Sequence, residues 1–370
     1  MTVAALLRPL KVGPLDLPSR VVMPALTRMR AGSDGVPTEL MREYYAQRAG
    51  AGLIIAECTQ VSPQACGFPG CPGIYNEEQV AGWRRVTDAV HAAGGRIFCQ
   101  VWHAGGMSHP SNQPDDALPI GPSSQRPLMN VLTSGFKPAE MVPPRALETD
   151  ELPDIVAQFA RAAERAIRAG FDGVEIHGAN GYLLEQFMKR STNCLTDAYG
   201  GSVENRARLT CEVVDAVTDV VGAQSVGLRL SPWGELNSPV EEDAAVYEMA
   251  AQHASRRRIA YLHVIEPRSS MSPTSDAVRT VELDAATFFR PLFDGVLISA
   301  GGWTFDAAEA AIAAGKVDAV AFGRLFIANP DLVQRFSRGA PLNAYNRASF
   351  YGGGQTGYTD YPFLEVVEAS

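Results

Sequence analysis

The sequence predicts an α/β protein built as one (β/α)8 barrel, the TIM-barrel fold. Short β-branched and apolar runs alternate with longer amphipathic runs, as in a parallel sheet with helical crossovers. The chain has 370 residues, a length that fits one barrel with insertions. The runs give eight strands with helices between them, the count at which such a barrel closes. No boundary or linker interrupts the pattern, so residues 1–370 are expected to form a single domain.

The strands are expected where short apolar runs occur: Arg20–Met23, Leu53–Cys58, Arg96–Trp102, Gly173–Ile176, Ser225–Leu230, Ala260–Val264, Gly295–Ser299 and Val317–Phe322. Helical patterns lie between them: Glu39–Arg48, Glu77–Ala92, Asp150–Ala169, Glu204–Val221, Glu241–Arg257 and Thr304–Ala314. Asn76, with Gln79 three residues later, is a typical N-cap for the second of these helices. A last helix is expected to open at Asn329-Pro330-Asp331, with a cap followed by a proline.

Two segments fall outside the repeat. Gly13 and Pro14 could turn a short N-terminal hairpin that closes the bottom of the barrel. Residues 104–149, after the third strand, are rich in Pro, Gly, Ser and Asn. Because long loops in compact domains are usually functional or disordered, this insertion is expected to form a lid or a pocket wall.

Composition excludes several classes of function. The net charge of −9 argues against nucleic acid or an anionic membrane as the main partner. No apolar run is long enough to span a bilayer, and Arg8-Pro9 ends the only apolar N-terminal stretch, so a cytoplasmic protein is expected. The six cysteines form no C-x2-C pair and are expected to be reduced. His103 and His109 have no third ligand in view, so no metal site is expected.

The most informative stretch begins where the fourth strand ends. His177, Asn180 and Tyr182 arrive within six positions, and glycines between them let the backbone turn sharply. A lone histidine at a strand end is often only structural, but beside Asn180 it forms a pair of donors for one oxygen. Tyr182, with a reference pKa of about 10, is protonated at neutral pH and can act as an acid. This set lacks a nucleophile, so a bound cofactor must supply electrons.

Alternation along the strands sorts the inward side chains. Glu175 and His177 point into the barrel from the fourth strand, and Arg229 points inward from the fifth. A buried Arg and a buried Glu on neighbouring strands are expected to pair. Arg229 then either fills the barrel or reaches an electron-rich cofactor, and the two roles are compatible. Gln100 and Trp102 share a face of the third strand.

The ends of the last two strands predict a phosphate site. Ala300-Gly301-Gly302 and Gly323-Arg324 combine exposed backbone N–H groups with a guanidinium, and barrels commonly bind phosphate at this place. The other interpretation of Arg324 is an ordinary surface arginine.

Several motifs together resemble the Old Yellow Enzyme family of FMN-dependent ene-reductases. The resemblance runs nearly end to end, through Met23–Arg30, Gln100–His103, His177–Leu184, Asp197–Arg206, Phe322–Arg324 and Tyr351–Gly354. The branch that it most resembles contains the bacterial pentaerythritol tetranitrate and N-ethylmaleimide reductases.

The resemblance implies a tightly bound, non-covalent FMN on the carboxyl-terminal face of the barrel. The implied cofactor contacts are Pro24, Ala25, Leu26, Thr27, Cys58, Gln100, Arg229, Ala300, Gly301, Gly302, Gly323 and Arg324. The implied catalytic residues are His177, Asn180 and Tyr182, and the implied substrate contacts are Phe68, Trp102, His177, Asn180 and Tyr351.

The implied reaction is a ping-pong reduction. NADPH or NADH reduces FMN, and hydride then passes from flavin N5 to the β carbon of an electron-poor alkene: an α,β-unsaturated aldehyde, ketone or imide, or a nitroalkene. Tyr182 protonates the α carbon. Reduction of nitrate esters or nitroaromatics in the same site is the alternative within the family. The enzyme is expected to be a monomer or a homodimer.

Two hypotheses from other classes remain at this stage. One is a flavin-free barrel lyase or isomerase that uses His177 and Tyr182 as an acid–base pair. The other is a non-catalytic flavin-binding relative, which would need a broken catalytic set.

Three details depart from the nearest family pattern. The donor pair is His/Asn where some relatives have His/His, so only His177 can add charge. Phe68 stands where a tyrosine is frequent. Cys58 stands where an alanine is common, and a buried inert thiol is expected there.

Overall fold

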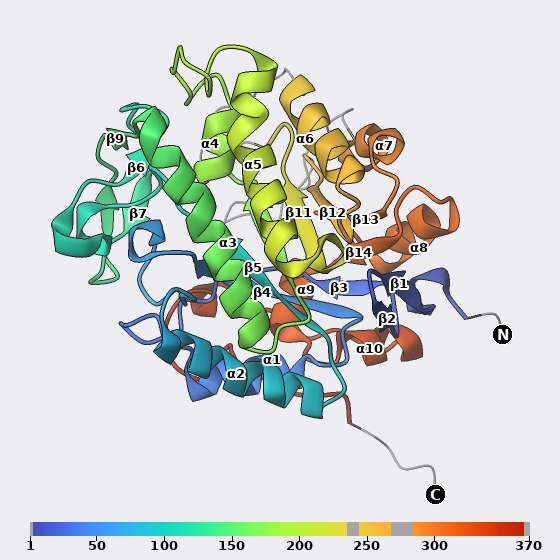
Figure 1. Cartoon of the computed structure of the whole chain (residues 1–370). Coiled ribbons are helices and arrows are strands. Elements are labelled where there is room, and N and C mark those ends of the chain that lie inside the picture. Colours follow the sequence, from blue (N-terminus) through green and yellow to red (C-terminus); the bar gives the residue numbers. More distant parts are fainter. Residues whose placement is uncertain (1–2, 235–243, 268–283, 366–370) are drawn as a thin grey trace, which may run out of the picture.

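Eight parallel strands close into a barrel (Figure 1), in the order β10-β11-β12-β13-β14-β3-β4-β5. The structure is a computed structural model, and it describes residues 3–234, 244–267 and 284–365. The strands are β3 (Val21–Met23), β4 (Leu53–Gln60), β5 (Ile97–Trp102), β10 (Gly173–Gly178), β11 (Val226–Leu230), β12 (Tyr261–Ile265), β13 (Val296–Ala300) and β14 (Ala319–Ala321). All eight expected strands are present, and the predicted TIM-barrel fold is confirmed.

The strands form where the chain is apolar because both faces of the sheet are covered. Every residue of β4, β5, β10 and β11 is buried, as expected for a parallel sheet between a packed interior and a layer of helices. The β4–β5 register shifts between Ala56 and Thr59, within a β4 that extends two residues past the predicted end. Such a bulge re-aims side chains, and Cys58 lies in it.

Ten helices are described: α1 (Glu39–Gln47), α2 (Glu77–Ala92), α3 (Leu152–Arg168), α4 (Leu183–Met188), α5 (Val203–Val221), α6 (Ala245–Arg256), α7 (Ala285–Phe289), α8 (Phe305–Ala313), α9 (Gly323–Ala328) and α10 (Leu332–Arg338). The predicted cap of α2 is confirmed, because the Gln79 backbone N–H donates to Asn76 Oδ1 at 2.9 Å. Residues 241–243 of the predicted helix Glu241–Arg257 lie outside the described ranges. No helix in the described ranges is long and apolar enough to cross a membrane.

The predicted opening of the last helix was wrong. α10 begins at Leu332, after Asp331 rather than Asn329. The Asn329 amide instead donates to the Leu325 carbonyl at 2.9 Å, and its oxygen accepts from the Asn343 N–H at 2.7 Å. The short helix α9, which precedes it, has no place in the predicted pattern.

The two additions to the barrel lie at opposite ends. β1 (Leu10–Val12) and β2 (Leu15–Leu17) form the predicted hairpin, and Val12 and Leu17 pack into the apolar cluster that fills the barrel. The insertion after β5 contains β6 (Ile120–Gly121), β7 (Asn130–Leu132), β8 (Pro138–Glu140) and β9 (Arg145–Ala146). It lies beyond α3 and α4, on the opposite side of Figure 1 from the hairpin.

Candidate active site at the carboxyl-terminal end of the barrel

The predicted catalytic residues meet where β10 ends. His177 is the second-last residue of the strand and is buried. Tyr182, five residues later, is the N-cap of α4. Their ring centroids lie 5.3 Å apart. Between them, Asn180 and Gly181 both have positive φ, 60° and 75°, so the chain reverses within two residues. The strand end therefore places an imidazole, an amide and a phenol in one short loop.

Aromatic side chains form one wall beside this loop. The Trp102 ring meets the Tyr182 ring edge to face, with centroids 5.2 Å apart. Phe68 stacks on Trp102 at 6.0 Å and lies 6.4 Å from Tyr182. The insertion adds Met107 to the same apolar surroundings of Phe68 and Tyr182. The predicted substrate contacts Phe68 and Trp102 thus come together around the phenol.

His177 is a neutral imidazole rather than a charged donor. Burial, helped by the nearby Arg229 guanidinium, lowers the pKa of His177 to about 3. The expectation that His177 could add charge is therefore corrected: at neutral pH it can donate one N–H and carries no charge. Among the described residues, His177 Nδ1 has no hydrogen-bond partner, although it is buried.

The expected ion pair between Glu175 and Arg229 is not formed, although the structure describes both residues. Glu175 accepts instead from Gln100 Nε2 at 2.7 Å, and its other oxygen lies 2.8 Å from His263 Nδ1. Desolvation raises the pKa of Glu175, but the neighbouring His263 and Arg229 lower it further, to about 2. The carboxylate is therefore ionised. Sequence alternation placed Glu175 correctly but missed His263, which the register sets opposite Arg229.

Arg229 provides the test of whether the barrel end fits a flavin. Its side chain is buried, desolvation lowers its pKa, and no described residue accepts a hydrogen bond from Nε. A buried guanidinium with an unused donor needs an acceptor, because a buried donor without a hydrogen bond costs about 1–3 kcal/mol. The oxygen- and nitrogen-rich edge of an isoalloxazine ring offers such acceptors, so this position fits FMN.

Residues that follow β3, together with Cys58 in the bulge of β4, line the neighbouring part of the same end. The Thr27 hydroxyl lies 3.1 Å from the Cys58 thiol. Thr27 follows the end of β3, and Cys58 lies in the bulge of the adjacent strand β4. A Cβ on Gly323 would lie 3.3 Å from Leu26 and 3.7 Å from Pro24. Pro24 and Leu26 therefore lie close to the residue that follows β14, and Thr27 contacts Cys58 of β4.

The predicted phosphate residues follow two paired strands. Ala300 of β13 is opposite Ala321 of β14, so Gly301-Gly302 and Gly323-Arg324 emerge side by side. Gly301 and Gly302 have φ values of 117° and 66°. Glycine adopts such angles without strain, and its lack of a side chain lets a ligand approach the backbone closely.

The segment with Tyr351 reaches the site from the C-terminal part of the chain. The Gly352 N–H donates to the Arg28 carbonyl at 2.9 Å, one residue past Thr27. The Arg28 guanidinium donates to the carbonyls of Phe350 and Gly357, each at 2.9 Å. Tyr351 itself is about half exposed, at 45%, so it can form an outer edge of the pocket.

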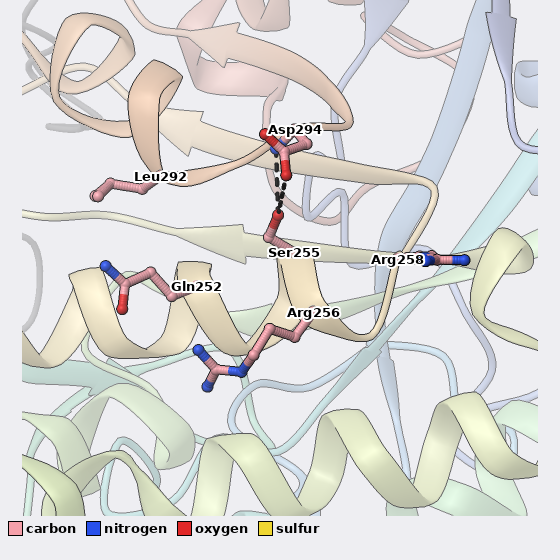
Figure 2. Close-up of a pocket in the computed structure, with 6 residues that line it drawn as sticks. All are labelled: Gln252, Ser255, Arg256, Arg258, Leu292 and Asp294. Atoms are coloured by element: carbon pink, nitrogen blue, oxygen red, sulfur yellow. Dashed lines mark hydrogen bonds between the residues drawn. The ribbon is translucent and has the colours of Figure 1, made fainter.

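A separate hollow lies at the opposite end of the barrel. It has a volume of about 410 Å³ and is lined by Gln252, Ser255, Arg256, Arg258, Leu292 and Asp294 (Figure 2). These residues precede β12 and β13, so they lie at the amino-terminal end of the barrel. Two of the lining residues bond to each other, because the Asp294 N–H donates to Ser255 Oγ at 3.2 Å.

Sequence reasoning also missed polar residues directly below the catalytic loop. Glu185, Gln186 and Ser231 are buried and bond to the loop. The available signal was weak: charged or amide side chains in a short run that is otherwise apolar.

Comparison with known proteins gives one consistent result. Residues 5–343 match the model of the NADH:flavin oxidoreductase / NADH oxidase family. The chain is 45% identical to 12-oxophytodienoate reductase 1 of Oryza sativa subsp. japonica, over 98% of this chain and 94% of that protein. A structure of morphinone reductase in complex with tetrahydroNAD superposes with a TM-score of 0.90 at 46% identity, covering 99% of each chain. The Old Yellow Enzyme homologue from Zymomonas mobilis superposes with a TM-score of 0.92 at 40% identity, covering 97% of this chain and 99% of that one.

Proposed function

Because the chain belongs to the NADH:flavin oxidoreductase / NADH oxidase family, which includes the Old Yellow Enzymes, we propose that it reduces activated carbon–carbon double bonds. It is a flavoprotein oxidoreductase that uses FMN and NAD(P)H. The proposed substrates are α,β-unsaturated aldehydes, ketones and imides, and nitroalkenes. The names of relatives that reduce 12-oxophytodienoate and morphinone support this class.

The residues after β10 supply the activation of the substrate. When bound, FMN supplies the hydride that is added to the β carbon. His177 and Asn180 donate hydrogen bonds to the carbonyl or nitro oxygen, where negative charge develops as the double bond is polarised. Donors held rigidly at such an oxygen typically contribute about 2–4 kcal/mol each to lowering the barrier. A neutral imidazole can do this without a change of protonation.

Tyr182 is the proposed proton donor to the α carbon. Its phenol lies against the imidazole of His177, at a centroid distance of 5.3 Å, and against Trp102. The apolar rings of Phe68 and Trp102 exclude water from the side of the phenol that they cover. Arg229 and Gln100 are proposed to hold the polar edge of the flavin, and Gly301, Gly302, Gly323 and Arg324 its phosphate.

The observation that carries the proposal is the meeting of two oxygen-binding donors and a phenol at one strand end. The test starts from the purified protein: its visible spectrum, and identification of the chromophore released by heat. The protein is then reduced with deuterated NADPH and mixed with 2-cyclohexenone. We expect deuterium at the β carbon and a solvent hydrogen at the α carbon. NADPH oxidation that no alkene accelerates would overturn the proposal.

A nitro oxygen can occupy the same pair of donors, so nitroaromatics and nitrate esters are assayed with the same reduced protein. Faster oxidation of the reduced enzyme by these compounds than by any alkene would favour the alternative activity.

A further inference from the structure

We infer that Glu185 and Ser231 are positioning residues of alkene reduction, which act by fixing the backbone between Asn180 and Tyr182. Neither residue reaches the substrate in the proposed function, on which this inference rests. Both are buried, at 0% and 2% exposure. They lie beneath the loop that joins β10 to α4, so they can affect its geometry without touching a ligand.

The loop needs to be held because its conformation is unfavourable. Asn180 has φ = 60°, a region that residues other than glycine adopt sparsely, and Gly181 follows with φ = 75°. Residues held in such regions persist only where the surrounding structure determines them. A loop released from these contacts would relax and shift the Asn180 side chain.

Ser231 holds the backbone of Asn180. The backbone N–H of Asn180 donates to Ser231 Oγ at 2.8 Å, and the Ser231 hydroxyl donates to Glu185 Oε1 at 2.7 Å. Because the serine hydrogen is committed to the carboxylate, the oxygen must present a lone pair to Asn180. The carboxylate thus fixes the orientation of the hydroxyl, and the hydroxyl fixes the backbone of the catalytic asparagine.

Gly181 is held at both of its polar groups. Its N–H donates to the second oxygen of Glu185, and its carbonyl accepts from Gln186 Nε2 at 2.7 Å. Both partners belong to the first turn of α4, whose N-cap is Tyr182. The helix therefore clamps the peptide groups that separate the oxygen-binding amide from the proton donor.

The surroundings of Glu185 offer a matched control. The Tyr247 hydroxyl donates to the same oxygen, Oε1, at the same distance of 2.7 Å as Ser231. Tyr247 belongs to α6, an element separate from the loop and from Ser231. Removing either hydroxyl deletes one bond to the carboxylate, and the loss of Ser231 also removes the bond to the Asn180 N–H.

The experiment compares Ser231→Ala with Tyr247→Phe in the FMN-loaded protein. Each variant is reduced with NADPH and then oxidised by increasing 2-cyclohexenone in a stopped-flow instrument, which separates the limiting rate from the dissociation constant. For Ser231→Ala we expect a limiting rate lower by about tenfold to a hundredfold, the cost of misplacing catalytic groups by about 1 Å. Tyr247→Phe is expected to change it less than about twofold. Ser231→Thr, which keeps the hydroxyl, is expected to recover most of the rate.

The outcomes separate the two proposals. Equal limiting rates for Ser231→Ala and Tyr247→Phe, or no recovery in Ser231→Thr, would show that Ser231 is structural and overturn the inference. A wild-type protein that reduces no alkene would instead overturn the proposed function. If Ser231→Ala does not fold, Glu185→Gln takes its place, because a carboxamide has one acceptor oxygen and cannot hold both Gly181 and Ser231. Its limiting rate is expected to fall in the same range, and an unchanged rate would contradict the inference.

Discussion

At the scale of single residues, the chemistry depends on which protonation states burial allows. His177 lies between a buried guanidinium and an aromatic wall, and its pKa is lowered to about 3. The imidazole is therefore uncharged in the folded protein, and the proposed oxygen-binding pair of His177 and Asn180 is neutral at both positions. The stabilisation of developing charge must then come from well-placed dipoles, because no positive charge is available at the donor pair itself.

The first prediction concerns pH. We expect the limiting rate of alkene reduction to show no histidine ionisation between about pH 5 and pH 8, because His177 stays neutral there. The neutral state also favours the folded protein. The pKa of His177 in the folded state lies below its unfolded value of about 6.5. The contribution of neutral His177 to the free energy of unfolding is therefore fully present above about pH 6.5 and is lost as pH falls toward about 3. A rate profile with an inflection near pH 6.5 that disappears in His177→Asn would contradict this prediction.

The second prediction concerns Tyr182→Phe. Reduction of the flavin by NADPH is expected to be nearly unchanged, since that half-reaction needs no proton from the phenol. Oxidation by 2-cyclohexenone is expected to slow by about 10²- to 10⁴-fold, the usual contribution of a general acid. Stopped-flow traces of both half-reactions measure this directly. Equal slowing of the two would remove Tyr182 from the role of proton donor.

The sequence predicted the contiguous part of the site better than the part that depends on barrel contacts. His177, Asn180 and Tyr182 are neighbours in the chain, so their proximity follows from one strand end. The partner of Glu175 could not be chosen from alternation alone, because Gln100, Arg229 and His263 all point inward from nearby strands. In the packed barrel, Gln100 and His263 are the hydrogen-bond partners of Glu175.

At the scale of secondary structure elements, β4 connects the site to its surroundings. Glu57 is buried on this strand, accepts from the Arg28 N–H at 3.0 Å, and receives a bond of 3.2 Å from the Tyr45 hydroxyl of α1. Desolvation raises the pKa of Glu57 to about 6. The strand that bears Cys58 therefore also bears a carboxyl that is costly to ionise.

The third prediction follows from this raised pKa. The folded state holds the proton of Glu57 more tightly than the unfolded chain does. The stability that this group contributes is therefore fully present below about pH 4.5 and is lost as pH rises through about 6. The loss is about 2 kcal/mol near neutral pH, an order-of-magnitude figure. Urea unfolding at several pH values should show it in the wild type and not in Glu57→Gln. The exposed Glu78→Gln is the control and should keep the wild-type slope.

Element boundaries show where sequence patterns fail. Long amphipathic helices such as α2 and α5 were predicted almost to the residue, since they have one buried face and a side-chain cap. The six-residue helices α4 and α9 were missed. Every residue of α4 is buried, so no alternation of polar and apolar residues marks it, and its form is imposed by the strand ends that it covers.

At the scale of the whole molecule, one stack of side chains connects the two halves of the chain. The Arg48 guanidinium lies 3.7 Å from the centroid of Tyr44, the rings of Tyr44 and Tyr358 stack at 4.1 Å, and Arg30 lies 4.2 Å from Tyr358. Cation–π contacts of this kind strengthen when they are desolvated, and Tyr358 is fully buried. The stack holds the C-terminal segment against α1 and the segment that follows β3.

The fourth prediction tests this connection. Tyr358→Ala removes a ring from the middle of the stack and is expected to lower the free energy of unfolding by about 3–5 kcal/mol, as buried aromatic truncations do. It should also raise the dissociation constant for the alkene, because Tyr351 loses its support. Phe363→Ala, at a half-exposed position, should change neither quantity appreciably. Equal losses of stability in the two variants would contradict the role of the stack.

The closure of the barrel has a consequence for how the chain is made. β3 completes its hydrogen bonding only through β14, with Val21 opposite Val320 and Val22 opposite Ala321, about 300 residues apart in the chain. On the ribosome the first strand of the barrel therefore emerges long before its second neighbour exists. Until β14 has left the exit tunnel, one edge of the sheet stays open to pairing with other chains, a common route to aggregation of unfinished proteins.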